Sequence, residues 1–326
     1  MSVNGTLGAV ADSLFPSQLN WLEQKWENYY NYMDNDIVAT GLLLLCVHEI
    51  MYFSRSIPWM ILDSMPSMRK YKIQDNRPPT RKQYLDCLKE VLIAHALIEA
   101  VPIFGFHFVC DMFNISYRAP FPSLVTIGWQ LAVLFFIEDT WHYFGHRILH
   151  TKFMYKRFHK QHHKYAAPFG MTAEYAHPLE VAFTGTGTVG SPLLLSYLGA
   201  DMHLLTVMMW ISLRLIQAID SHSGYEFPIS LHHFLPIWAG ADHHDDHHHY
   251  FVGNYASSFR HWDYLFGTET PAFSRRRNQG TRPEEKRHED VIDPADLDEM
   301  KKRAAAASSS AAKPTAAAPT QRKVKI

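Results

Sequence analysis

Residues 138–163 read EDTWHYFGHRILHTKFMYKRFHKQHH, and the chain is organised around this stretch. Histidines recur here and again near residue 244 in three short patterns: His142-x3-His146, His159-x2-His162-His163 and His244-x2-His247-His248. Residues three and four apart share one face of a helix, so the imidazoles within each pattern are expected to point the same way. Eight imidazoles in three such groups are too many for one metal ion and suit two. Neutral imidazole binds Zn, Cu, Fe and Ni.

Two simpler explanations compete with a metal site. A single buried histidine is usually a hydrogen-bonded core residue, and an exposed histidine-rich tract often binds metal only adventitiously. However, 11 of the 21 histidines lie in the windows 142–163 and 243–249. Neither explanation accounts for an H-x2-HH pattern that occurs twice beside an H-x3-H pattern. The spacing therefore predicts a functional dinuclear metal site.

The patterns and their surroundings resemble a known family. H-x3-H, H-x2-HH and H-x2-HH in this order are the histidine boxes of the membrane-bound fatty acid hydroxylase/sterol desaturase superfamily. Further strings are similar to its sterol C4-methyl oxidase branch: EDTWHYFGHR, HKQHHKYAAPFG, AHPLE, HSGYEFP and NYASSFRHWDYLFGT. The resemblance runs from about residue 40 to about residue 272, so both ends of the chain lie outside it.

Apolar stretches divide the rest of the chain. A helix needs roughly 17–20 apolar residues to cross a bilayer, and the candidates are 37–57, 90–113, 124–140, 181–198 and 203–219. Pro102 and Gly105 interrupt the second, so a kinked span and a re-entrant hairpin are both open. The last two read as a helical hairpin. The expected fold is all-α, a polytopic membrane bundle of about four to five membrane segments with a cytosolic histidine-box metal domain.

Two polar residues fall late in the first apolar stretch. His48 and Glu49 are costly in a bilayer unless they reach an interface or a partner. Arg55 follows within about two turns, which favours a position at the membrane interface. A polar contact with another helix is the alternative.

Composition sets the outer limits. The net charge of −1 provides no basic field for nucleic acid, and three cysteines without a CxxC pair predict neither a disulfide framework nor a zinc knot. The first twenty residues lack the parts of a cleavable signal peptide. We expect an interfacial segment over 1–36, a hydroxylase domain over 37–271 and a charged, low-complexity, disordered tail over 272–326.

Basic residues set the expected orientation. Lys and Arg are frequent in 58–89 and in 147–164, whereas 114–123 contains only Arg118 and the turn 199–202 contains none. Short cytosolic loops carry an excess of such residues. Crossing at each apolar stretch then places every histidine box and the C-terminus in the cytosol.

The predicted metal ligands are the histidines of the three patterns, joined by His222 and His177 on the basis of the resemblance. His232, His233 and His261 are expected to be ordinary histidines. A metal-binding imidazole needs a partner for its second ring nitrogen. Nearby acids are candidates for that role, with helix capping or a solvated surface as the alternative: Glu138, Asp139, Asp245 and Asp246.

Dioxygen chemistry suits this ligand set better than hydrolysis, because a hydrolytic zinc site typically has three protein ligands and one water. The resemblance implies a non-heme di-iron monooxygenase of the endoplasmic reticulum membrane, with zinc able to replace the two Fe in a purified sample. It would oxidise the 4α-methyl of 4,4-dimethyl sterols through alcohol and aldehyde to carboxylate, in ergosterol-type biosynthesis.

The resemblance also implies partners. Electrons would come from NAD(P)H by way of cytochrome b5 or its reductase, which agrees with the lack of a Gly-rich dinucleotide fingerprint. Other sterol C4-demethylation enzymes would act beside it. The alternatives are a sister sterol C5-desaturase or fatty acid/ceramide hydroxylase and, from another class, a histidine-lined metal transporter or store. A transporter should place ionisable ligands inside its spans.

Overall fold

The computed structural model describes residues 19–270, so the predictions for the first residues and the tail lie outside it. All regular elements of the described range are helices, which confirms the all-α prediction. The described residues form two compact units. The first unit contains residues 19–55, 86–138 and 185–217, and the second contains 56–85, 139–184 and 218–270.

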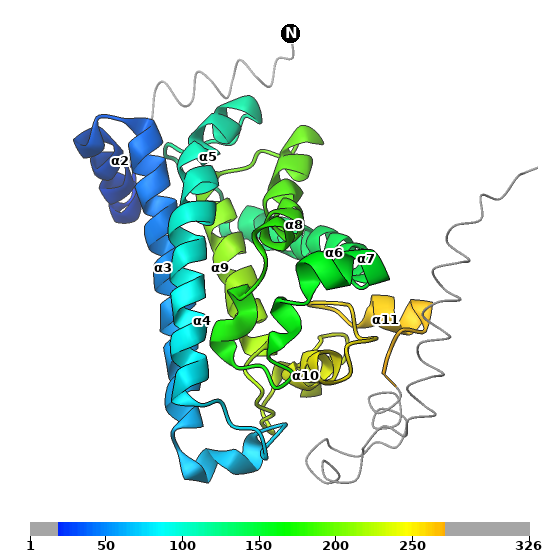
Figure 1. Cartoon of the computed structure of the whole chain (residues 1–326). Helices are drawn as coiled ribbons and strands as arrows, with labels where there is room; N and C mark the ends of the chain where they lie inside the picture. Colours follow the sequence, from blue (N-terminus) through cyan, green and yellow to red (C-terminus); the bar gives the residue numbers. More distant parts are fainter. Residues whose placement is uncertain (1–18, 271–326) are drawn as a thin grey trace, which may run out of the picture. The chain divides into compact units, whose positions relative to one another are not determined.

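Long helices build the first unit and continue past its limits (Figure 1). They are α2 (Trp21–Met33), α3 (Asp36–Asp63), α4 (Arg81–Ala94), α5 (Ala100–Met112), α6 (Leu124–Leu149), α8 (Pro178–Tyr197) and α9 (Leu204–Ser221). Four helical stretches are long and apolar enough to cross a membrane: Asp36–Asp63, Arg81–Met112, Leu124–Leu149 and Leu204–Ser221. The chain is therefore a membrane protein.

The second apolar stretch is one continuous helix. A π-helical turn, η2 (His95–Glu99), joins α4 to α5, and Pro102 follows it. A proline ring clashes with the carbonyl four residues earlier and removes one hydrogen bond of the helix. The wider turn immediately before it absorbs this defect. Of the two possibilities left open by the sequence, a kinked span and a re-entrant hairpin, the continuous helix agrees with the span.

Aromatic and aliphatic side chains fill the core of the first unit. Tyr30, Leu134 and Trp210 are fully buried there. The indole Nε1 of Trp210 donates a hydrogen bond to the carbonyl oxygen of Thr188, at 2.8 Å. The polar atom of this large side chain is thus satisfied inside an apolar core.

The polar residues late in α3 contact another helix. His48 Nε2 lies 3.3 Å from Glu99 Oε2, and His95 Nδ1 lies 2.9 Å from Glu49 Oε1. Both contacts join α3 to η2. The structure therefore shows the helix-to-helix contact, and the interfacial position expected for His48 and Glu49 is not needed to explain them.

The two loops that are poor in basic residues lie together in the first unit. Ser116 N donates to Met202 O at 2.9 Å, and Leu204 N donates to Ser116 O at 2.7 Å. His203 Nε2 and Arg118 O are 3.0 Å apart. The connection between α5 and α6 and the turn between α8 and α9 therefore belong to the same end of this helical unit.

Short helices and loops build the second unit around the histidines. These elements are η1 (Pro66–Tyr71), α7 (Lys152–Met154), η3 (Tyr155–His159), η4 (His162–Lys164), η5 (Gly170–Glu174), η6 (Leu231–His233), α10 (Ala241–Tyr250) and α11 (His261–Phe266). Such short helices are not stable alone, because helix nucleation is costly. Polar contacts also fix the loops between them: Tyr225 OH, for example, donates to Asp63 Oδ1 at the end of α3, at 2.9 Å.

Candidate metal centre

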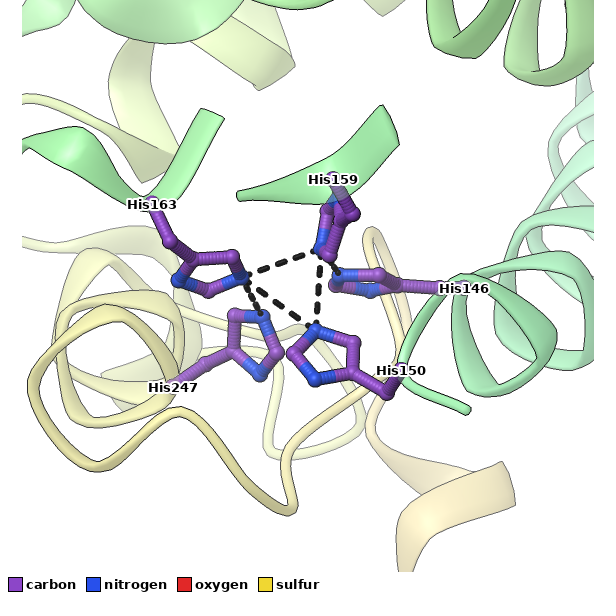
Figure 2. A group of neighbouring side chains, drawn as sticks. All are labelled: His146, His150, His159, His163 and His247. Carbon is purple, nitrogen blue, oxygen red and sulfur yellow. Dashed lines mark hydrogen bonds between the residues drawn. The ribbon is translucent and has the colours of Figure 1, made fainter. Parts of the chain in front are cut away.

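Five histidines converge on one point in the second unit (Figure 2). His159 Nε2 lies 3.1 Å from His146 Nε2, 2.9 Å from His150 Nε2 and 3.0 Å from His163 Nε2. His247 Nε2 lies 3.1 Å from His163 Nε2. We call this set the first histidine group: His146, His150, His159, His163 and His247.

Four more histidines converge on a second point. His222 Nε2 lies 3.2 Å from His162 Nε2 and 3.0 Å from His244 Nε2. His248 Nε2 lies 3.1 Å from His244 Nε2. This set is the second histidine group: His162, His222, His244 and His248.

Each H-x2-HH pattern supplies both groups. In α10, His244 and His248 are one turn apart and enter the second group, whereas His247 enters the first. Adjacent helical residues point about 100° apart, so a histidine doublet cannot serve one ion with both rings. In the earlier pattern, His162 is the member that goes to the second group. The repeated pattern thus belongs to two neighbouring metal positions.

The spacing of the nitrogens fits metal ions. Two ligands at right angles, each about 2.1 Å from an ion, are separated by about 3.0 Å. The facing Nε2 atoms of both groups lie 2.9–3.2 Å apart. Imidazole suits iron and zinc alike, so the donor set fits the predicted non-heme iron and does not distinguish it from zinc.

The second ring nitrogen of several ligands is held by a fixed acceptor. Nδ1 lies 2.8 Å from Tyr255 O in His146, 2.7 Å from Gly253 O in His247 and 2.8 Å from Ala218 O in His222. Carbonyl oxygens only accept, so these imidazoles carry their proton on Nδ1. Their Nε2 lone pairs are thereby directed to the metal positions.

A carboxylate plays this part for His159. Glu180, in the first turn of α8, places Oε1 2.7 Å from His159 Nδ1. Burial is the largest influence on Glu180 and raises the pKa of its carboxyl to about 7. A carboxylate on the far nitrogen makes an imidazole a stronger ligand and fixes its ring orientation.

Burial keeps the imidazoles neutral. It is the main cause that lowers the pKa of His159 to about 3 and that of His162 to about 4. The pKa values of His163, His244, His247 and His248 are also well below the ordinary value, through burial and neighbouring histidines. The lone pairs are thus available to metal at neutral pH.

The structure brings together eight of the ten predicted ligands and adds His150 to them. Among the described residues, the two groups include neither His142 nor His177. His177 Nδ1 instead accepts a hydrogen bond from Leu179 N at the start of α8, at 3.2 Å. The complete ligand set remains a prediction. A signal for His150 was present, because His146-x3-His150 repeats the H-x3-H spacing.

The four predicted acids make polar contacts with groups outside the two histidine groups. Asp139 Oδ1 accepts from the backbone N–H of Ser258 at 2.7 Å. Asp245 Oδ1 accepts from Gln74 Nε2 at 2.8 Å, and Asp246 Oδ2 accepts from Thr270 Oγ1 at 3.2 Å. In the first unit, Glu138 Oε2 pairs with Arg214 Nε at 2.8 Å. Their role as partners of the ligands remains a prediction.

Comparisons with known proteins agree with this geometry. The profile of the fatty acid hydroxylase family matches residues 131–268, which include both histidine groups. No solved structure matches the chain.

Curated relatives match most of the chain. A methylsterol monooxygenase of Aspergillus fumigatus is 53% identical over 265 residues, which cover 81% of this chain and 90% of that protein. A C-4 methylsterol oxidase of Candida albicans is 57% identical over 77% of this chain and 82% of its own length. Methylsterol monooxygenase 1 of Rattus norvegicus is 43% identical over 79% and 87%. At these identities and coverages, the chain belongs to the methylsterol monooxygenase family.

Proposed function

We propose that this chain oxidises the 4α-methyl group of a 4,4-dimethyl sterol stepwise to the carboxylate, with dioxygen as oxidant. The observation that carries the proposal is the convergence of nine Nε2 atoms on two neighbouring points. The relatives are named methylsterol monooxygenase and C-4 methylsterol oxidase, and these names support the substrate class. A chain with helices able to cross a membrane is suited to a substrate that dissolves in the bilayer.

One iron ion is proposed for each histidine group. Bound iron supplies the activation of dioxygen that no side chain of the protein supplies. The protein holds nine neutral imidazoles around the two positions and keeps their protons on the far nitrogens. It also removes the site from water, since the side chains of His247 and His248 are fully buried.

Each turnover must balance. A methyl group becomes an alcohol when one dioxygen and two electrons are consumed with two protons and one water is released. Two further oxidations at the same carbon give the aldehyde and the carboxylate. The electrons are proposed to come from NAD(P)H through cytochrome b5 or its reductase, in the endoplasmic reticulum membrane, with the histidine groups facing the cytosol. Other sterol C4-demethylation enzymes are proposed to take the product.

The experiment combines the purified, iron-loaded chain with a 4,4-dimethyl sterol and a cytochrome b5 reducing system under labelled dioxygen. The expected products are the 4-hydroxymethyl and then the 4-carboxy sterol, with label in the new oxygen groups. A matched control is His247→Ala, which removes one ligand of the first group and should give no product.

Two outcomes would contradict the proposal. A product with a new ring double bond and no label would indicate a desaturase. Hydroxylation of a fatty acyl chain or ceramide without any sterol product would assign the chain to another branch of the superfamily. In cells that lack the protein, 4,4-dimethyl sterols should accumulate, and their absence would exclude the proposed substrate.

A further inference from the structure

A third cluster of ligand-type side chains lies outside both histidine groups, in the second unit. Glu226 Oε1 lies 2.8 Å from His233 Nε2 and 3.1 Å from His232 Nε2. Asp242 Oδ1 lies 3.9 Å from His232 Nε2. Glu226, His232 and His233 come from the segment that leads from α9 to α10, Asp242 lies in the first turn of α10, and nothing in the proposed reaction uses them.

The carboxylates of the cluster are buried, the side chains of His232 and His233 are 9% and 24% exposed, and the polar contacts are poorly aligned. Glu226 is fully buried, and Asp242 is 2% exposed. Neither carboxylate oxygen of Glu226 and neither ring nitrogen of His232 makes a hydrogen bond within the described part of the chain, although oxygen and nitrogen lie at contact distance. Buried polar groups are nearly always hydrogen-bonded, and an ion between them is one explanation for an exception.

The neighbouring carboxylates favour a positive charge on His232. Burial lowers the pKa of His232, but Glu226 and Asp242 outweigh this, so the pKa lies above its ordinary value even though Arg260 opposes them. The carboxylates that attract a proton to this ring also attract a metal ion, which competes with that proton.

The surrounding segment has little apolar packing of its own. Ile229 is 80% exposed and Phe234 is 72% exposed, on either side of the two histidines. The turn η6 spans three residues and buries none of them. Short segments that lack a core are commonly held by a metal or a disulfide. Ordering this segment matters because α10 follows it and carries three histidines of the two groups: His244, His247 and His248.

The close packing of Gly240 also fixes the cluster. A Cβ atom at Gly240 would lie 2.2 Å from His232 Nδ1 and 2.7 Å from Asp242 Oδ1. Gly240 is the N-cap residue of α10. Because glycine has no side chain, the His232 ring can pack directly against the first residue of α10.

We propose that Glu226, His232 and His233 bind a third divalent metal ion, with Asp242 beside it. This ion has a structural role: it orders the segment that leads into α10. Two imidazoles and a carboxylate are nitrogen and oxygen donors that Zn²⁺ accepts at about 2.0–2.2 Å. This site is independent of the proposed reaction, because none of its residues belongs to either histidine group.

The test is metal content per chain, measured on the full-length protein purified in detergent and equilibrated with Zn²⁺ alone before unbound metal is removed. Glu226→Gln and His233→Ala should each lose one equivalent of metal relative to the unmodified chain. The matched control His261→Ala removes a histidine that lies in none of the ligand groups and should lose none. His247→Ala removes a ligand of the first histidine group and should still bind metal at the third site. A loss of metal from the two histidine groups is therefore distinguishable from a loss at this site.

A second variant at the same position separates the loss of a metal ligand from a loss of folding. Cysteine is also a zinc ligand, so His233→Cys should recover the equivalent that His233→Ala loses. Hydrogen exchange of residues 226–240 should be faster in His233→Ala than in His233→Cys. Unchanged metal content in both Glu226→Gln and His233→Ala would overturn the proposal and leave the cluster as an ion-paired network. So would a His233→Cys variant that folds but binds no more metal than His233→Ala.

Discussion

At the scale of single residues, His150 shows where spacing stops being informative. His142, His146 and His150 follow one another at intervals of four, so two overlapping pairs have the same H-x3-H spacing. Which pair meets the other histidines depends on the rotation of α6, which distant residues set. Gly145 is one such point: a Cβ atom there would lie 3.0 Å from the ring of Phe183. The pattern was readable from sequence, but its register required the tertiary packing.

The ligand set leads to a first prediction. His150→Ala should lower bound metal in the first group and reduce turnover by more than about 100-fold, because a direct ligand is lost where a supporting partner already accounts for 10–100-fold. His142→Ala removes the same residue type one turn earlier on α6, from a position outside both groups, and should retain more metal and more activity. Metal analysis and product formation measure both effects. A larger loss in His142→Ala than in His150→Ala would reverse the assignment.

Glu180 is a residue that no sequence pattern connected to the histidines. It lies 21 positions after His159 and meets its Nδ1 only because the chain folds back at the start of α8. We expect Glu180→Gln to reduce metal affinity or turnover by about 10–100-fold, since the neutral amide no longer strengthens His159 as a ligand. Glu90→Gln, at an exposed position of α4, is the control. Metal titration of the two variants measures the effect. Equal metal affinity of Glu180→Gln and Glu90→Gln would show that Glu180 does not support the site.

At the scale of elements, α10 illustrates why the supporting partners were not predictable. Three residues just after it adopt positive φ values: Phe251 at 61°, Gly253 at 77° and Asn254 at 51°. This turn brings Gly253 O back to His247 and Tyr255 O to His146. Backbone carbonyls are present at every position, so no sequence pattern marks the ones that bind.

One of the acids expected next to the histidines, Asp139, binds the backbone that follows this turn. Asp139 Oδ1 accepts from the backbone N–H groups of Ser257, Ser258 and Phe259 at 3.3, 2.7 and 3.1 Å. These hydrogen bonds join this acid to the loop and not to an imidazole, so its role as a partner of a metal ligand remains a prediction. An acidic residue close to the histidines in the sequence indicates the region in which it lies, but not the group that it hydrogen-bonds.

Asp263 provides the matching prediction for this element. It is fully buried and accepts from Tyr255 N at 2.8 Å, Ala256 N at 2.8 Å and Thr268 Oγ1 at 2.6 Å. Asp263→Ala leaves these donors without their acceptor and should lower the free energy of unfolding by about 3 kcal/mol. It should also reduce bound metal, because Tyr255 O moves away from His146. Asp263→Asn retains one acceptor oxygen and should lose less. Thermal unfolding in detergent compares them, and an unchanged Asp263→Ala would contradict this role.

At the scale of the whole molecule, the path of the chain constrains the number of crossings. The four candidate spans alone would place His162 and His222 on opposite sides of the membrane, because only α9 would cross between them. Yet His222 Nε2 lies 3.2 Å from His162 Nε2. Since a chain returns to the same side only after an even number of crossings, either α8 and α9 both cross the membrane as a hairpin or neither of them crosses it. The apolar stretches in the sequence favour the hairpin, which remains a prediction because α8 is not among the four helical stretches that are long and apolar enough to cross.

The turn between α8 and α9 therefore provides the last prediction. It is bonded to the α5–α6 connection through Ser116 and Met202, so both should lie on the side away from the histidine groups. An Asn-x-Thr acceptor in a flexible spacer, inserted at residues 199–201, should be glycosylated in cells, as should one inserted in 114–123. The same insertion at residues 72–80 should remain unmodified. Modification at 114–123 but not at 199–201 would show that the hairpin enters the bilayer without crossing it, and modification at 72–80 would invert the proposed orientation.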